Sequence, residues 1–175
     1  MIHESKGTNI APAAIITVCL ALLFTPGPAS ASDPARDDKT AGDISWMSHE
    51  AAKDMLKKTD KSLYIFFFTN WCGYCTKMDR ETLANKDVID YINENYLPVR
   101  VNAEKEKKVA SAYRVRGFPT NIFAQGEGKP GSSLPGYVGP GDFLNILKYI
   151  HTGAYEDMSI DVFIEREEKK TARAE

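Results

Sequence analysis

Two cysteines in the sequence Cys72-Gly73-Tyr74-Cys75 are the residues of this chain best suited to do chemistry. A strand pattern precedes them and a helical pattern follows, which predicts that Cys72 lies at the N-terminus of a helix. The unpaired N–H groups and the positive dipole end there stabilise a thiolate and lower its pKa from about 8.5. We therefore expect Cys72 to be the nucleophile of thiol–disulfide exchange. Cys75, one turn inside the helix, would resolve the mixed disulfide and leave a Cys72–Cys75 disulfide.

The two residues between the cysteines complete the expected active-site loop. Gly73 allows the chain to turn tightly. Tyr74 is expected at the rim of the site. The two residues between the cysteines of such a motif influence the stability of the thiolate and hence the redox potential.

Three other uses of this cysteine pair can be weighed from the residues alone. A zinc site needs further ligands, and beyond the first 31 residues the chain offers only His49 and His151. A covalent haem site needs a histidine directly after the second cysteine, where Thr76 stands. A purely structural disulfide would close a loop too small to constrain the unfolded chain much. We therefore expect no metal and no cofactor besides a redox-active disulfide.

The elements that must position the cysteines alternate between strand and helix patterns. Residues 63–68 form a continuous apolar run, which is typical of a strand buried on both faces in the middle of a sheet. Helices are expected over residues 48–58, 76–83, 87–95 and 105–113 and from residue 140 onward, further strands over 97–101, 121–124 and 134–138, and a turn over 126–131. This order predicts an α/β fold with a mixed central sheet flanked by helices in three layers.

Composition and charge narrow the class of protein. The 175 residues are 43% hydrophobic and 26% charged, an ordinary globular mixture that fits one compact domain. Lys and Arg total 22 against 24 Asp and Glu, a formal net charge of -2. Without a basic surplus to neutralise phosphates, nucleic acid is not expected as a partner.

The first 31 residues have the layout of a secretory signal peptide. A short basic start is followed by the apolar stretch 13–24 and by the small residues 29–31, after which cleavage is expected. An uncleaved membrane anchor is the alternative, although the apolar run is shorter than the roughly 20 residues a spanning helix needs. Lipid attachment at Cys19 is a minor option. Cleavage would leave only the two cysteines of the motif in an exported chain without stable membrane insertion.

Two motifs together resemble the thioredoxin family. Residues 68–75, Phe-Thr-Asn-Trp-Cys-Gly-Tyr-Cys, follow the buried strand and open a helix, and Gly-Phe-Pro-Thr at residues 117–120 comes later. The resemblance covers residues 46–150 and is closest to exported thioredoxin-like proteins. It implies a thioredoxin fold and thiol–disulfide oxidoreductase activity.

The resemblance also implies roles for three further residues. Trp71 corresponds to the residue that shields one side of the site. The alternative prediction, given equal weight, is that Trp71 is a core aromatic. Phe118 and Pro119 correspond to the loop that faces the cysteines, where the proline is cis and the backbone of the preceding residue pairs with an extended substrate. The alternative for Pro119 is an ordinary proline at the start of a strand.

One position departs from the family pattern. Cytosolic thioredoxin has a buried Asp on the active strand, thought to help deprotonate the resolving thiol, and this chain has Phe66 there. The proton acceptor would then be water, another residue or the substrate thiolate. Lys77, Asp79 and Glu81 on the active-site helix are candidates to tune the local field, or are simply solvated.

These observations predict a monomeric periplasmic reductase of protein and peptide disulfides, recharged by a membrane electron donor. A disulfide isomerase or oxidase is the first alternative, because Gly-Tyr between the cysteines is also similar to periplasmic isomerases. Those proteins, however, carry a dimerisation domain and a Thr before the cis proline, where this chain has Phe118. The second alternative is a thioredoxin-fold binding module in which the cysteines matter little.

The expected organisation has four parts. They are a signal peptide over residues 1–31, a flexible leader over 32–43, the thioredoxin-like domain over 44–152, and a C-terminal extension with a charged tail over 153–175. The extension carries apolar residues that can dock it on the domain, namely Met158, Ile160, Val162, Phe163 and Ile164.

Overall fold

The computed structural model describes residues 43–124 and 131–174. The expected signal peptide over residues 1–31 therefore lies outside the described residues, as do nearly all of the expected leader and most of the expected turn over 126–131.

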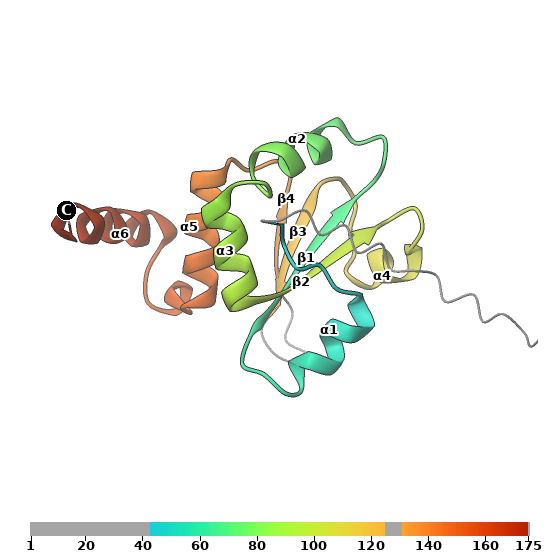
Figure 1. Cartoon of the computed structure of the whole chain (residues 1–175), viewed down its shortest axis with the longest axis horizontal. Helices are drawn as coiled ribbons and strands as arrows, with labels where there is room; N and C mark the ends of the chain where they lie inside the picture. The colour runs from blue at the N-terminus through green and yellow to red at the C-terminus, as the bar shows by residue number, and fades with distance from the viewer. Residues whose placement is uncertain (1–42, 125–130, 175) are drawn as a thin grey trace, which may run out of the picture. The chain divides into compact units, whose positions relative to one another are not determined.

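A four-stranded mixed sheet with the order β2-β1-β3-β4 forms the centre of the described chain (Figure 1). The strands are β1 (Ser62–Phe68), β2 (Tyr96–Asn102), β3 (Thr120–Ala124) and β4 (Ser132–Pro135). β1 pairs parallel with β2 and antiparallel with β3, and β3 pairs antiparallel with β4. The predicted α/β thioredoxin fold is confirmed, with β1 in the interior of the sheet.

Helices flank the sheet, and local capping signals mark the start of several of them. They are α1 (His49–Leu56), α2 (Gly73–Glu81), α3 (Lys86–Asn95), α4 (Lys107–Ala112), α5 (Pro140–His151), the 3-10 turn η1 (Ala154–Glu156) and α6 (Ile160–Ala174). The Ser48 hydroxyl accepts the N–H of Ala51 at the start of α1, and the Asn85 side chain caps α3 in the same way. Pro140 opens α5, where its missing N–H costs nothing.

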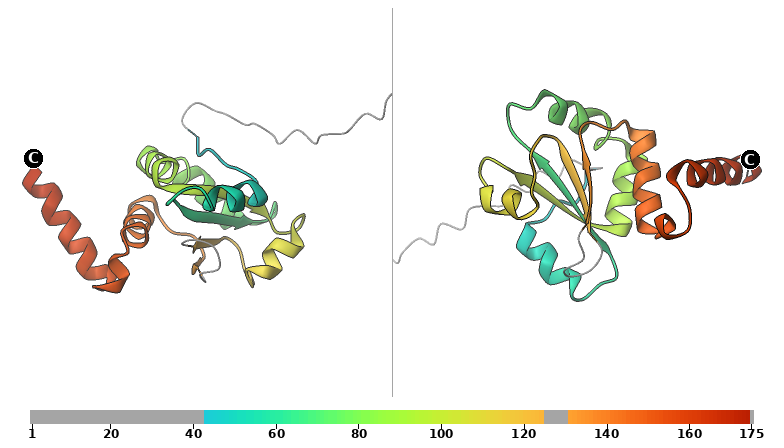
Figure 2. Two further views of the ribbon diagram at one scale, coloured as in Figure 1. Left: turned by 90° about the horizontal axis from the view of Figure 1, so that it is seen from below. Right: turned by 180° about the vertical axis from the view of Figure 1, so that it is seen from behind.

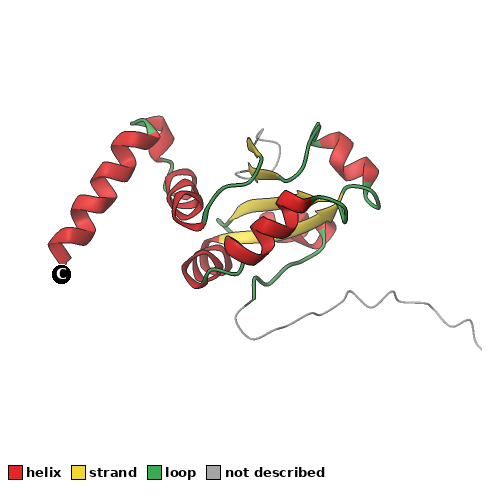
Figure 3. Ribbon diagram, turned by 90° about the horizontal axis from the view of Figure 1, so that it is seen from above, coloured by secondary structure: helices red, strands yellow, loops and turns green. Residues whose placement is uncertain are grey.

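The alternation of side chains along β1 divides the core into two clusters. Tyr64 and Phe66 face one side of the sheet, where α2, α3 and α5 contribute Met78, Val88, Ile89, Ile92, Phe143, Leu147 and Ile150. Leu63, Ile65 and Phe67 face the other side, where α1 and α4 contribute Ala52 and Ala110. Figure 3 shows helices on either side of the strands. Burial on both faces explains why the sequence of β1 is an unbroken apolar run.

The fourth strand lies earlier in the chain than the sequence predicts. It covers Ser132–Pro135 and not residues 134–138. Gly136 ends it by adopting a left-handed conformation with φ of 91°, which strongly favours glycine. The Gly136 N–H donates to the Pro119 carbonyl at 2.8 Å, so a contact with a distant loop sets the end of this strand.

The C-terminal extension continues from α5 through Gly153 and η1 into α6, whose first turns contact α5 (Figure 2). Phe163 is buried and its ring lies 5.4 Å from that of Tyr149, whose hydroxyl donates to the Met158 carbonyl at 2.6 Å. Val162, also expected to dock, is instead 53% exposed. Phe163 therefore provides the main apolar contact of α6.

We expect Phe163→Ala to release α6 while the rest of the domain stays folded, because the substitution removes a buried ring from a helix that is otherwise mostly exposed. Amide hydrogen exchange over residues 160–174 should rise at least about tenfold. Val162→Ala is the matched control on the same turn and should change nothing. Equal protection of α6 in the two variants would contradict this account of its docking.

Candidate active site

The two cysteines lie where β1 gives way to α2, and they form a disulfide. Cys72 is the N-cap residue of α2 and its Sγ accepts the backbone N–H of Cys75 at 3.1 Å. This cap explains why α2 begins at Gly73, earlier than the expected residue 76. A sulfur in this position receives an N–H bond that becomes stronger when the sulfur is a thiolate.

The residues of the disulfide differ in their access to solvent. Cys72 is 5% exposed and Cys75 is 1% exposed, with Cys75 belonging to the same buried cluster as Met78 and Phe66. A reagent that approaches from solvent therefore meets Cys72 first.

Aromatic side chains form the rim around the disulfide. Trp71 is 71% exposed and Tyr74 is 66% exposed, so the interpretation of Trp71 as a core aromatic is wrong. The Trp71 ring meets the ring of Phe118 edge to face, with 6.1 Å between centroids. Large apolar surface open to solvent at this edge is available to a partner.

Trp71 is held by Glu104, a residue that the sequence did not single out. Its indole N–H donates to Glu104 Oε1 at 3.1 Å, and the backbone N–H of Asn70 donates to Oε2 at 3.4 Å. Asn102, at the end of β2, joins Asn70 and Glu104 by accepting the N–H of Glu104 at 3.0 Å and donating to Asn70 Oδ1 at 3.2 Å. Their position just after a strand at the active-site edge of the sheet is the signal that could have indicated them.

The loop that enters β3 lies beside this rim. The Phe118–Pro119 peptide bond is cis. The Thr120 hydroxyl donates to the Gly117 carbonyl at 2.8 Å and closes the turn. The ring contact between Phe118 and Trp71 brings this loop next to the cysteine motif.

An ion pair lies close to Phe66, the position where cytosolic thioredoxin has its buried acid. Phe66 is fully buried, and its partner across the β1–β2 ladder is Arg100. The Arg100 guanidinium donates two hydrogen bonds of 2.8 Å to the two carboxylate oxygens of Asp79 on α2. Asp79 is therefore engaged in a bidentate pair rather than simply solvated. The sequence analysis did not identify Arg100.

The other charged residues of α2 are engaged at the surface. Lys77 lies 3.8 Å from the Glu81 carboxylate and 4.3 Å from the centre of the Tyr137 ring. The Tyr137 hydroxyl donates to Glu81 at 2.6 Å, and this hydrogen bond raises the pKa of Tyr137. Side chains this exposed interact weakly across water.

Two further polar groups are buried close to the site. The Tyr64 hydroxyl donates to Asn121 Oδ1 at 3.0 Å, and burial raises the pKa of Tyr64 well above its usual value. The Thr69 hydroxyl is buried with no hydrogen-bond partner, whereas the Thr69 carbonyl accepts the N–H of Cys72 at 3.3 Å. Tyr64 is therefore neutral at neutral pH.

The described residues show no cluster suited to a metal ion. Within residues 43–124 and 131–174, no group of three or more His, Cys, Asp or Glu side chains is placed to bind one. His49 is hydrogen-bonded to Tyr113, and the His151 ring packs against Tyr91 and Tyr96. Over the same two ranges, no helix has the length and apolar character needed to span a bilayer.

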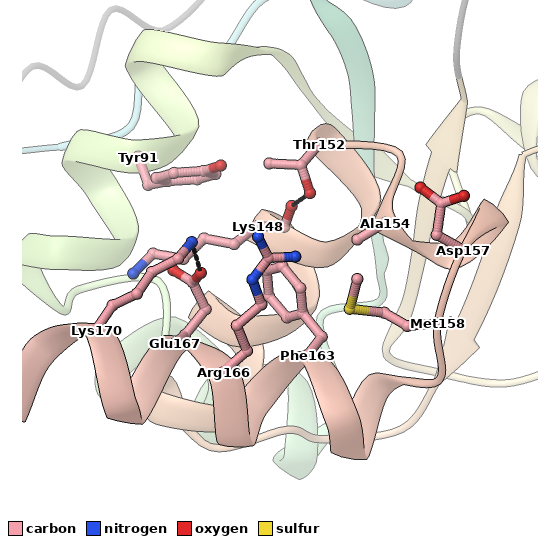
Figure 4. A pocket seen from close by; sticks show the side chains of 10 residues that line it. All are labelled: Tyr91, Lys148, Thr152, Ala154, Asp157, Met158, Phe163, Arg166, Glu167 and Lys170. Atoms are coloured by element: carbon pink, nitrogen blue, oxygen red, sulfur yellow. Dashed lines mark hydrogen bonds and ion pairs between the residues drawn. The ribbon is translucent and has the colours of Figure 1, made fainter.

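A cavity of about 410 Å³ lies away from the cysteines, between α3, α5 and α6 (Figure 4). Its lining residues are Tyr91, Lys148, Thr152, Ala154, Asp157, Met158, Phe163, Arg166, Glu167 and Lys170. Glu167 and Lys170 form an ion pair across one helical turn. Because no residue of the cysteine motif or of the Phe118–Pro119 loop lines this cavity, it is separate from the active site.

A disulfide that caps a helix, with one sulfur nearer to solvent, defines the site of a thiol–disulfide oxidoreductase. The chain belongs to the family of thioredoxin-like domains, since a family model of that description matches residues 49–151.

Individual relatives agree with this membership. The thioredoxin of Borreliella burgdorferi is 32% identical over 100 residues, which cover 55% of this chain and 79% of that protein. The disulfide bond reductase DsbH of Chlamydia pneumoniae is 26% identical over 102 residues, which cover 51% of this chain and 61% of that protein. A solved thioredoxin-fold protein from Helicobacter pylori matches with a TM-score of 0.55 and 25% identity, covering 63% of this chain and 86% of that one. The chain spans less than two thirds of the length of several curated relatives that it matches.

We expect Glu104→Ala to free the Trp71 indole without unfolding the domain. The lost hydrogen bonds are largely exposed, so the free energy of unfolding should fall by less than about 1 kcal/mol. Hydrogen exchange of the Trp71 indole N–H, followed by NMR, should accelerate severalfold. Glu106→Ala, a nearby carboxylate removal, should leave that exchange rate unchanged, and a similar acceleration in both variants would refute the role given to Glu104.

Proposed function

We propose that this chain is an exported reductase of protein and peptide disulfides, with Cys72 as the attacking thiol and Cys75 as the resolving thiol. The observation that carries the proposal is the position of the Cys72 sulfur at the start of α2, where it accepts the N–H of Cys75 while disulfide-bonded to that residue. Once the disulfide is reduced, a sulfur in this position is stabilised as a thiolate, and its resolving partner is within bonding distance.

The reaction balances with the two cysteines alone. The Cys72 thiolate attacks one sulfur of the substrate disulfide and expels the other as a thiolate, which takes a proton from solvent. Cys75 then loses its proton and attacks the Cys72 sulfur, which forms the Cys72–Cys75 bond and releases the second substrate thiolate. Two electrons pass from the dithiol to the substrate, and no metal or organic cofactor takes part.

The rim favours an extended protein segment as the substrate. Trp71, Tyr74 and Phe118 offer apolar contacts on the solvent side of Cys72. We infer that the backbone of Phe118, ahead of the cis Pro119, pairs with a substrate strand, and the contact of the Phe118 ring with Trp71 supports this. A folded partner with no exposed strand would make few contacts with this surface.

The proposed direction and location rest on the sequence and on one relative. The chlamydial relative is named a disulfide bond reductase. The basic and apolar start of the chain and its small residues at 29–31 favour cleavage of a signal peptide over 1–31 and export. In that compartment a monomeric reductase, comprising leader 32–43, domain 44–152 and extension 153–175, would receive its electrons from a membrane carrier.

We expect the chain without residues 1–31, reduced beforehand, to reduce insulin disulfides. Cys72→Ser should abolish this activity, because no thiolate remains at the helix N-terminus. Cys75→Ser should instead accumulate a mixed disulfide with the substrate, visible by mass spectrometry. Retained function of the Cys72→Ser protein, together with intact substrate binding, would favour the alternative of a non-catalytic binding module.

The reduction potential of the Cys72–Cys75 pair tests the direction of electron flow. We expect a value of about -270 mV when the protein is equilibrated with a reference thioredoxin, because the disulfide of a reductase must be more stable than the disulfides of its substrates. A value between about -120 and -180 mV would instead indicate an oxidase or isomerase of exported proteins.

A further inference from the structure

The cavity between α3, α5 and α6 has two cationic side chains on its wall that no carboxylate of the described chain neutralises (Figure 4). Lys148 comes from α5 and Arg166 from α6, and within residues 43–124 and 131–174 neither side chain forms an ion pair or a hydrogen bond. Lys148 is only partly exposed. Because a charge withdrawn from water normally has a counterion, these two side chains are suited to bind the negative charge of a ligand.

The Tyr91 side chain adds a neutral donor to the same wall. It comes from α3, its ring contacts those of Tyr96 and His151, and burial raises its pKa. Its hydroxyl has no hydrogen-bond partner among the described residues, and in Figure 4 this hydroxyl points into the cavity toward Thr152. A phenol that stays protonated can donate a hydrogen bond to an anion.

The carboxylates that line the cavity do not cancel these cations. Glu167 is bonded to Lys170 at 2.5 Å, so those two charges neutralise each other. Asp157 lies across the cavity from Lys148 in Figure 4, and no ion pair joins it to Lys148, Arg166 or Lys170. The part of the wall that carries Lys148 and Arg166 therefore remains positive.

Apolar side chains complete the wall, and the volume of the cavity suits a small molecule. Ala154, Met158 and Phe163 line it beside the polar groups. Its volume of about 410 Å³ lies within the range of small-molecule sites, which combine apolar walls with a few convergent polar groups. The chemistry that matches such a wall is an organic anion with an apolar body.

We propose that this cavity binds a small organic anion, with its apolar body against Met158 and Phe163 and its negative charge at Lys148 and Arg166. Phe163 and Arg166 belong to α6 and Lys148 belongs to α5, so the site is complete only while α6 packs on α5. Binding of the anion therefore stabilises the docked position of α6. The inference is independent of the cysteine chemistry, because no residue of the cysteine motif lines the cavity.

Titration with 2-naphthoate, an aromatic carboxylate, tests the proposed class of ligand. We expect a Kd of about 1 mM or tighter, which a ligand of this size reaches in a formed site, and shifts of the Tyr91 and Thr152 signals in NMR spectra. The neutral amide of the same shape, 2-naphthamide, should bind about tenfold more weakly, because it makes no charge-assisted hydrogen bond. Equal affinity of the two compounds, or no binding of 2-naphthoate, would overturn the inference.

Substitutions at the wall separate a specific site from a general attraction to positive charge. Lys148→Gln and Arg166→Gln should each weaken 2-naphthoate binding about tenfold and leave 2-naphthamide binding unchanged, whereas Arg166→Lys should retain most of the affinity. The matched control is Lys169→Gln, since Lys169 lies on α6, is bonded to Glu165 and does not line the cavity. If this control weakens 2-naphthoate binding as much as Lys148→Gln does, the proposed site is wrong.

Amide hydrogen exchange tests the link between the ligand and α6. At ten times its Kd, 2-naphthoate should slow exchange over residues 160–167 about tenfold, because a ligand that binds only the docked state stabilises it by that factor. The same concentration of 2-naphthamide should have a much smaller effect. Phe163→Ala, which we expect to release α6, should also lose 2-naphthoate binding. Unchanged exchange in the presence of bound 2-naphthoate would show that the ligand binds elsewhere and would overturn the inference.

Discussion

The N-terminus of α2, fixed at the end of a buried strand, is the constraint on which the rest of this structure depends. β1 pairs with a neighbour on both sides and is buried on both faces, so the chain leaves it at a defined point. Cys72 follows within a few residues and caps the helix, with its sulfur accepting the N–H of Cys75. Because free N–H groups crowd this end of the helix, a negative charge is favoured on Cys72 more than elsewhere on α2. The aromatic rim and the cis-proline loop therefore lie beside a sulfur whose position is set by the end of β1 and the start of α2.

The apolar character of β1 has a consequence for the charges around it. With Phe66 at the position of a buried acid, the carboxylate that pairs with Arg100 comes from Asp79 on the active-site helix and not from β1. The aromatic rings of Trp46, Phe66 and Phe68 surround the guanidinium and limit its contact with water. Asp79, the acid that pairs with Arg100, lies on α2, the helix that begins at the cysteine motif. The ion pair therefore links α2 to β2.

Local signals predicted those elements whose boundaries are set locally. The buried run of β1, the Ser48 cap of α1 and the Pro140 start of α5 all act within a few residues, and the sequence located each of them. β4 was misplaced because Gly136 ends it through a hydrogen bond to the Pro119 carbonyl. The cysteine motif and the Phe118–Pro119 loop were also found in the sequence. Arg100 was missed because it meets Asp79 across two elements and no spacing along the chain encodes that meeting. Glu104 was missed although its position just after β2 could have indicated it.

The direction of electron flow follows from a balance of charges rather than from the fold. A thioredoxin-like protein becomes an oxidant when its reduced form is stabilised, and a helix N-terminus that favours the Cys72 thiolate acts in that direction. A reductase instead needs a disulfide that is more stable than its dithiol form relative to the substrate couple. The cap of α2 at Cys72 therefore does not by itself set the direction of electron flow. The relative stability of the Cys72–Cys75 disulfide and its dithiol is therefore what separates a reductase from an oxidase on this fold.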